Sequence, residues 1–315
     1  MPMKGRFAPS PSGRMHLGNV YTALLSRLSA YSQGGSWLLR IEDLDPQRSR
    51  YEHARMIEDD LDWLGLAWDE GGLDDRGDAG PYSQSRRSDI YEAFLERLTA
   101  TGRTYPCRCT RAEIMATQAP HQSDGRVIYG GHCRPRRLGG NAVETESDSR
   151  KAAVRLCVTD EDICFVDGVK GPQSFNLTRE VGDFILRRAD GAWAYQLAVV
   201  VDDALMGVTE VLRGDDLLLS AAQQIYLYRL LGFEAPRFVH VPLVCNEEGR
   251  RLSKRDAPMG MSYLRQHHTA EEVLGMAAFR VGIIREEQPL SFSELLELVS
   301  TEQSADGLFR SSGAK

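Results

Sequence analysis

The sequence has 315 residues, 42% of them apolar and 26% charged, which is ordinary for a globular protein of one large domain or two smaller ones. It contains no apolar run of about 18 residues and no basic segment followed by an apolar one, so we expect no membrane partner, no signal peptide and a cytoplasmic location. The net charge of −7 does not suggest nucleic-acid binding, although basic clusters at residues 134–137 and 250–255 leave room for it.

The first part of the chain, residues 1–104, alternates between strand and helix patterns. Apolar residues recur at helical spacing after Gly18 and again after Tyr51, and a short apolar run of strand length lies between them. This alternation is typical of an α/β fold built on a parallel sheet. The expected elements are helices over residues 20–31, 51–64 and 88–101 and a strand over 37–41.

The composition changes at Tyr105, where cysteine, glycine, proline and arginine become frequent. Residues 105–180 are predicted to form an inserted subdomain, with strands between 152 and 175 that turn at Asp167-Gly168. The α/β pattern resumes over residues 181–256. Its expected elements are a short helix or turn over 202–207, strands over 208–212 and 238–244, and a helix over 215–231. Residues 257–300 are expected to be helical, and 301–315 to be a flexible tail.

Three of the six cysteines are clustered in the predicted insertion. Cys107 and Cys109 form a C-x-C pair, and Cys133 follows. In a cytoplasmic protein, such a cluster favours a metal site over disulfides. Three thiolates suit Zn²⁺, and chemistry alone favours His132 or His121 as the fourth ligand. The alternative is a set of reduced cysteines without metal.

A loop rich in glycine, proline and serine, residues 8–13, leads to His16 and Gly18 at the start of the first predicted helix. Such a loop lets the backbone approach phosphates, and His16 can donate a hydrogen bond to a phosphate oxygen near the helix N-terminus. Gly18 leaves room for adenine or ribose to pack on the backbone. By itself, however, this short motif is more often a plain strand-to-helix turn.

A basic segment, Arg251–Arg255, follows the last predicted strand. Lys254 could place a mobile cation over the β- and γ-phosphates of ATP and stabilise charge on the leaving pyrophosphate, and Ser253 could bond the same phosphates. By itself, this segment is equally consistent with a solvated basic loop.

Taken together, these segments resemble those of glutamyl-tRNA synthetases, a family of class I aminoacyl-tRNA synthetases, and occur in the same order. The resemblance covers roughly residues 4–260 and rests on residues 6–19, 39–45, 195–203, 211–214 and 251–255. It implies a class I Rossmann-type catalytic domain in two halves, 1–104 and 181–256, followed by a short helical stem.

The same resemblance implies that His16, Gly18 and Lys254 are catalytic and that they bind ATP together with Asn19 and Ser253. Asn19 stands where the general class I pattern has a second histidine, and the second motif reads R-L-S-K-R rather than K-M-S-K-S. Both departures keep the key groups.

The resemblance further implies a site for L-glutamate. Arg6 and Tyr195 are expected to hold the side-chain carboxylate, Glu42 the α-ammonium and Arg213 the α-carboxylate. Val199 stands where similar glutamyl-tRNA synthetases commonly carry asparagine, and the loss of that amide favours a paralogue. Without the family context, Glu42 or Arg213 would be interpreted as part of a structural ion pair. The remaining residues expected to line the site are Phe7, Ala8, Pro9 and Ser10.

Among these paralogues, the chain resembles the truncated glutamyl-Q tRNA(Asp) synthetases. Their zinc site implies a structural Zn²⁺ held by Cys107, Cys109, Tyr129 and Cys133, although the spacing between its two halves is longer here. Only 60 residues follow Arg255, so no anticodon-binding domain is expected.

The implied function is ATP-dependent activation of L-glutamate, with Mg²⁺ on the ATP, and transfer of glutamate to the queuosine base at the wobble position of tRNA(Asp). A monomer is expected to do this. One alternative is a glutamyl-tRNA synthetase fragment that charges a tRNA 3′ end. Another is a catalytically silent RNA-binding paralogue, which the intact His16 and Lys254 argue against.

Overall fold

The core of the fold is a set of five parallel strands. The computed structural model describes residues 2–116, 128–135, 150–244 and 257–302. Strand β2 pairs with β1 and β3, and β9 pairs with β10, all in parallel. Hydrogen bonds between Lys4 and Thr209 place β1 beside β9, so the spatial order is β3-β2-β1-β9-β10. The strands are β1 (Lys4–Phe7), β2 (Ser36–Leu39), β3 (Glu70–Gly71), β9 (Glu210–Gly214) and β10 (Arg237–Val241).

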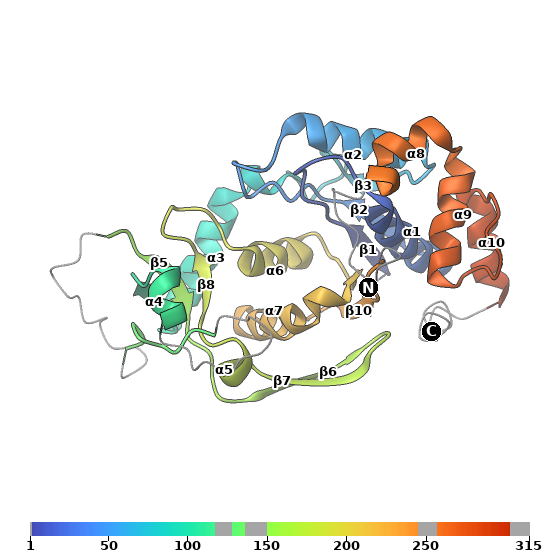
Figure 1. The fold of residues 1–315 in the computed structure, drawn as a ribbon. Coiled ribbons are helices and arrows are strands. Elements are labelled where there is room, and N and C mark those ends of the chain that lie inside the picture. The colour runs from blue at the N-terminus through green and yellow to red at the C-terminus, as the bar shows by residue number, and fades with distance from the viewer. Residues whose placement is uncertain (1, 117–127, 136–149, 245–256, 303–315) are drawn as a thin grey trace.

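Helices cover these strands on both sides, as the alternating pattern predicted (Figure 1). The crossover helix α1 (Leu17–Ser32) is buried along most of its length, because its apolar residues meet the strands on one side and the C-terminal helices on the other. The other elements of this part are α2 (Tyr51–Trp63), α3 (Ser88–Ala100), α6 (Tyr195–Leu205), α7 (Leu218–Leu231) and the 3-10 turns η1 (Gln84–Arg86) and η2 (Asp215–Leu217). The expected turn at 202–207 is therefore the last part of α6, and the expected helix from Asp215 begins as η2.

An antiparallel part is inserted between the two parallel groups. Strands β4 (Thr104–Cys107), β5 (Ala153–Leu156) and β8 (Phe184–Arg187) form one sheet, which α4 (Arg111–Ala116) accompanies. This sheet extends beyond residue 180, the boundary expected from the sequence. A long hairpin of β6 (Asp162–Asp167) and β7 (Gly171–Asn176), followed by α5 (Leu177–Glu180), reaches from the insertion back towards β10 (Figure 1).

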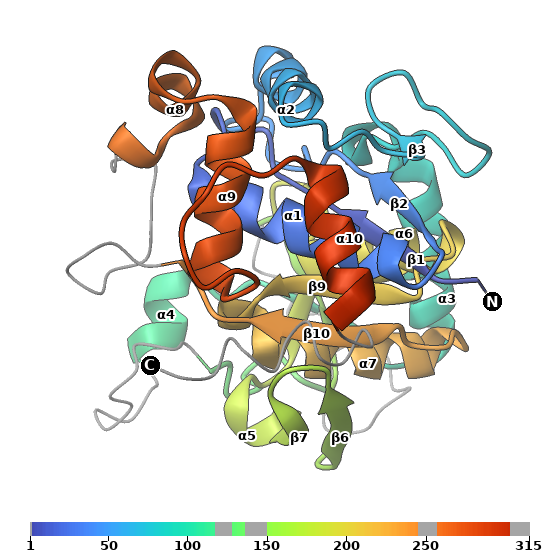
Figure 2. The same cartoon turned by 90° about the vertical axis from the view of Figure 1, so that its right-hand side faces the viewer.

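The last described segment is helical and packs on the first helix. It comprises η3 (Ala257–Met259), α8 (Met261–His267), α9 (Ala270–Val281) and α10 (Phe292–Glu302). Helices α9 and α10 lie across α1 (Figure 2), where the guanidinium of Arg27 sits 4.0 Å from the ring centroid of Phe292. Within the described ranges, no helix is long and apolar enough to cross a membrane.

Candidate active site

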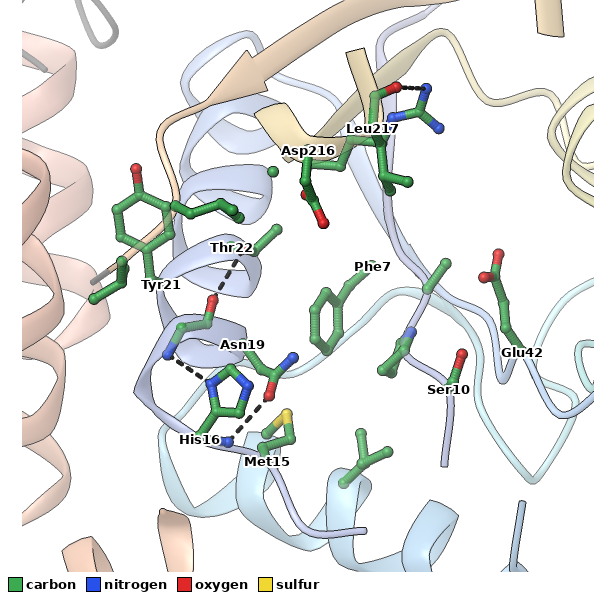
Figure 3. Close-up of a pocket in the computed structure, with 18 of the residues that line it drawn as sticks. Phe7, Ser10, Met15, His16, Asn19, Tyr21, Thr22, Glu42, Asp216 and Leu217 are labelled. Carbon is green, nitrogen blue, oxygen red and sulfur yellow. Dashed lines mark hydrogen bonds between the residues drawn. The ribbon is translucent and has the colours of Figure 1, made fainter. Parts of the chain in front are cut away.

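A cavity of about 490 Å³ opens at the carboxyl ends of β1, β9 and β10. This is the edge where open α/β sheets bind ligands, and the volume lies within the usual range for small-molecule sites. Figure 3 shows His16 and Asn19 on one side of Phe7 and Glu42 on the other. The lining residues include all those expected to bind glutamate and three expected to bind ATP: Arg6, Phe7, Ala8, Pro9, Ser10, His16, Gly18, Asn19, Glu42, Tyr195 and Arg213.

His16 is the N-cap of α1 and closes a capping box with Asn19. The backbone N–H of Gly18 donates to His16 Nδ1 at 3.1 Å, and the N–H of His16 donates to Asn19 Oδ1 at 3.0 Å (Figure 3). In the neutral imidazole, a nitrogen that accepts leaves the proton on the other nitrogen. His16 Nε2 can therefore donate to an anion at this helix N-terminus.

Gly18 has a steric reason to be glycine. A Cβ atom at this position would lie 3.0 Å from both Cε1 and Nδ1 of His16. Any side chain would require the imidazole to shift by a few tenths of an ångström. The glycine therefore leaves room for the histidine ring in its observed position, in addition to leaving the backbone open.

The other side of the cavity carries two buried cations and one buried anion. Arg6 and Arg213 are each 4% exposed and Glu42 is 9% exposed. Arg213 Nη1 donates to Tyr195 Oη at 3.5 Å. Burial raises the pKa of Glu42, against the opposing charges of Arg40 and Arg6. The charges mirror those of a zwitterionic dicarboxylic amino acid, which has two carboxylates and one ammonium group.

Behind these three groups lies a second layer of buried charges. Arg40 Nη2 donates to Glu42 Oε1 at 3.0 Å and Arg40 Nη1 to Asp203 Oδ1 at 2.6 Å. The same Asp203 oxygen is 3.6 Å from Arg6 Nε. Arg40 therefore holds Glu42 and Asp203 by charge-assisted hydrogen bonds, which fix side chains firmly in place, and Asp203 reaches Arg6 by a longer ion pair. Neighbouring Asp202 accepts in turn from Arg87, Gln84 and Tyr91.

Arg213 is held at all three of its nitrogens. Besides its contact with Tyr195, Nη2 donates to the carbonyl of Leu217 at 3.3 Å and Nε donates to His240 Nε2 at 3.0 Å. Burial lowers the pKa of Arg213 from its ordinary high value. His240 is itself fully buried, and its Nδ1 lies 2.6 Å from Asp167 Oδ2.

His240 predicts a pH dependence of stability. Burial lowers the pKa of His240 from its usual 6.5, and the hydrogen bond to Asp167 opposes this only in part. The unfolded chain then takes up a proton first, so the free energy of unfolding should fall as pH drops below about 6.5, by at most about 1.4 kcal/mol per pH unit.

Urea denaturation between pH 7 and 5 measures this effect, with His240→Gln as the comparison. The variant should lose the His240 contribution, whereas the remaining histidines contribute equally in both proteins. In the wild type, the bonds that Asp167 accepts from His240 and from the turn outweigh burial and lower its pKa, so it stays ionised in this window. In the variant, the backbone N–H groups of Val169 and Lys170 still donate to the Asp167 carboxylate. Identical slopes in the two proteins would contradict the prediction.

The clustered cysteines come together in the insertion. The sulfurs of Cys107, Cys109 and Cys133 all lie within 4.8 Å of one another. Tyr129 Oη is 3.4 Å from Cys107 Sγ and 4.0 Å from Cys109 Sγ, and it accepts from the N–H of Cys133 at 2.7 Å. Ligands at the usual Zn–S and Zn–O lengths sit about 3.5–3.8 Å apart around a tetrahedron, so these four groups fit zinc. Among the residues that the structure describes, His132 is not part of this cluster.

Two expected ATP-binding residues and one candidate metal ligand lie outside the described residues. These are Ser253, Lys254 and His121. The chain that follows the basic segment is described, and it returns to the first motif. The N–H of Met261 donates to the carbonyl of Met15 at 2.9 Å, and Gly260 bridges to His16.

Several groups that shape the cavity were not expected from the sequence. Asp203 and Arg40 lie inside quoted motifs, but no role followed from their types or spacing. Asp167 was expected only as a turn residue, and His240 was not singled out. Val199 is 1% exposed and is not among the residues that line the cavity. Its effect on glutamate binding stays a prediction.

Comparison with known proteins agrees with this geometry. Residues 2–307 match the family model for the catalytic domain of class I tRNA synthetases (E and Q). A relative from Symbiobacterium thermophilum named glutamyl-Q tRNA(Asp) synthetase is 48% identical over 93% of this chain and 90% of its own length. Glutamate–tRNA ligase 2 of Alkalilimnicola ehrlichii is 42% identical over 84% of this chain and 55% of its own length.

A solved structure is also similar. The glutamate tRNA ligase of Elizabethkingia meningosepticum, in complex with its amino acid, has a TM-score of 0.80 and 30% sequence identity. The match covers 97% of this chain and 65% of that one, so the chain spans about two thirds of the length of the solved ligase.

Proposed function

Because this chain belongs to the class I tRNA synthetases of the glutamate and glutamine type, we propose that it activates L-glutamate with ATP and transfers it to the queuosine base at the wobble position of tRNA(Asp). Its resemblance to glutamyl-Q tRNA(Asp) synthetases is confirmed, and it is an enzyme of the ligase class. The observation that carries the proposed chemistry is the charge pattern of one cavity, in which Arg6, Arg213 and Glu42 face a helix N-terminus.

Glutamate binding uses the charged side of the cavity. Arg6 and Tyr195 hold the side-chain carboxylate, Arg213 the α-carboxylate and Glu42 the ammonium group. Each charge of the substrate then meets an opposite charge that is already buried and fixed, so little reorganisation is needed when glutamate binds. Phe7, Ala8, Pro9 and Ser10 complete the wall of the site.

Activation joins glutamate to ATP at the N-terminus of α1. The α-carboxylate oxygen of glutamate attacks the α-phosphorus, the bond to the leaving pyrophosphate breaks, and glutamyl-adenylate forms. His16, Gly18 and Asn19 position the phosphates, while Ser253 and Lys254 stabilise the charge on pyrophosphate. Mg²⁺ bound with ATP would shield its phosphates. Transfer then forms an ester between an acceptor hydroxyl and the glutamyl group, with AMP as the leaving group.

The insertion has a structural part in this proposal. Cys107, Cys109, Cys133 and Tyr129 would hold a Zn²⁺ ion with all four positions filled, so the metal supplies stability and no reactive water. Residues 105–180 would form this metal-containing subdomain between the two catalytic halves, and 257–300 the helical stem.

The proposed acceptor of the glutamyl group is inferred from the names of similar proteins. The match spans most of a relative named for queuosine-containing tRNA(Asp), and only about half of one named glutamate–tRNA ligase 2. The second of these relatives, and the solved ligase, favour a second candidate function in which glutamate is attached to a tRNA 3′ end.

A charging assay separates the two functions. We expect radiolabelled glutamate to be attached to tRNA(Asp) that contains queuosine, and at least about 100-fold less to the same tRNA with guanosine at the wobble position, because the accepting hydroxyl is absent. Removal of the 3′-terminal adenosine from the queuosine-containing tRNA should not change the result. Equal labelling of queuosine-free tRNA(Glu) would contradict the proposal and support 3′-end charging.

A further inference from the structure

The tip of the β6–β7 hairpin is fixed to the strand beside the cavity. Gly168 N donates to the carbonyl of Phe238 at 2.9 Å, and a Cβ on Gly168 would lie 2.8 Å from Val239 Cγ2. Lys170 forms a 2.7 Å ion pair with Asp215. The hairpin tip therefore has little freedom to shift along β10, although it belongs to the insertion.

Asp167 stands at the centre of this contact. Its Oδ1 accepts from the N–H groups of Val169 and Lys170, at 3.0 and 2.9 Å, and from that of His240 at 3.2 Å. Its Oδ2 remains for His240 Nδ1, 2.6 Å away, and both side chains are fully buried. Since a carboxylate only accepts, Nδ1 must carry a proton.

The protonation state of His240 determines whether its Nε2 atom can accept a hydrogen bond from Arg213. A neutral imidazole with its proton on Nδ1 presents a lone pair on Nε2. Arg213 Nε, which always carries a hydrogen, lies 3.0 Å from that Nε2. The ring of Phe238 stacks near His240, 6.1 Å between centroids, and lies 5.2 Å below the guanidinium, so the imidazole has a packed surface against it.

We propose that Asp167 and His240 are positioning residues for the glutamate site. Asp167 selects the His240 tautomer that accepts from Arg213 Nε, and this bond turns the guanidinium so that its terminal nitrogens face the cavity. The inference rests on the proposed function, because it assigns Arg213 to the glutamate carboxylate. It adds that the hairpin of the insertion sets the geometry of the amino-acid pocket.

A matched pair of substitutions at His240 tests the proposal. The Gln side chain reaches the position of Nε2 and can accept from Arg213, whereas the shorter Asn side chain reaches only the position of Nδ1. We expect His240→Asn to raise the KM for glutamate by about 10- to 100-fold, the range for a lost bond to a charged group. His240→Gln should stay within about threefold of the wild type. The KM for ATP should be unchanged in both.

Asp167→Asn tests the tautomer itself. The Asn carbonyl can keep the three backbone bonds, while its amide N–H faces His240 Nδ1. The imidazole proton then moves to Nε2, where it opposes the N–H of Arg213. We expect a rise in the glutamate KM similar to that of His240→Asn, together with a somewhat lower thermal midpoint, because two buried N–H groups then face each other. This variant also carries the test if His240→Asn fails to fold.

The readout is glutamate-dependent ATP–pyrophosphate exchange, together with calorimetric binding of glutamate. Equal KM values for glutamate in the wild type, His240→Asn and Asp167→Asn would overturn the proposal, as would an equal rise in His240→Gln and His240→Asn or an equal rise in the KM for ATP. Wild-type protein that neither binds glutamate nor catalyses exchange would instead overturn the proposed function, and the inference with it.

Discussion

Replacement of Glu42 by glutamine should lower kcat/KM for glutamate by roughly 30- to 1,000-fold, the range expected when one partner of a buried charge pair is lost. Glutamine keeps the size of the side chain but cannot balance the ammonium group of the substrate. Its amide N–H₂ can also face Arg40, which in the wild type donates to Glu42 Oε1 at 3.0 Å. The loss should appear in both adenylate formation and glutamate binding.

Pyrophosphate exchange at varied glutamate concentration measures the effect. Asp43→Asn is the matched control, because the neighbouring Asp43 carboxylate bonds Ser85 and does not line the cavity. The control should keep wild-type exchange. Near-wild-type kcat/KM in Glu42→Gln would show that the ammonium group is bound elsewhere and would remove Glu42 from the proposed site.

Removal of the proposed zinc should destabilise the protein strongly. Binding at about 1,000 times the dissociation constant adds about 4 kcal/mol to the free energy of unfolding, which corresponds to a thermal midpoint higher by roughly 5–15 °C for a chain of this size. Cys109→Ser should abolish the metal content and bring the midpoint down by that amount. Purified wild-type protein should contain one zinc per chain by elemental analysis.

Two further variants make this result specific. Cys164→Ser should change neither metal content nor midpoint, because Cys164 is exposed and lies in the β6–β7 hairpin, away from the cluster. Tyr129→Phe should weaken zinc binding without abolishing it, since three thiolates remain. Full zinc affinity in Tyr129→Phe would mean that another group is the fourth ligand, and no zinc in the wild type would refute the metal site.

The parallel part of the fold was predictable because its signals are local. The helix that begins at Leu17 and the strand over Ser36–Leu39 follow from apolar spacing and from the Gly/Pro-rich loop before them. The antiparallel pairing of β8 with β5 was not predictable, because the partners are separated along the chain and the same short apolar run fits either kind of sheet. Helix α6 also continues through Asp202 and Asp203, whose buried carboxylates accept hydrogen bonds from Arg87 and Arg40. These partners come from distant parts of the chain, so local spacing does not reveal them.

The residues of the site that lie in recognisable sequence motifs could be predicted, and the others could not. Residues in the quoted motifs, such as Arg6 and Glu42, do line one cavity, and Cys107, Cys109 and Cys133 do meet. The roles of Asp167 and His240 were not predicted, because neither residue type nor spacing indicates that a hairpin tip will contact a strand from another part of the chain. Their contact exists only in the folded structure.

The buried charges of the pocket wall and of the layer behind it also limit how the specificity of this enzyme could be redesigned. Arg40 donates to both Glu42 and Asp203, and Asp203 forms a longer ion pair with Arg6. Replacing one of these residues by an apolar one therefore leaves a buried charge without its partner, at a cost of several kcal/mol. The effects of such replacements on the free energy of unfolding would not be additive, because the residues contact one another. A library that places apolar residues at these positions one at a time should therefore yield mostly unstable proteins, whereas simultaneous exchange of the whole set offers a route to a different amino acid.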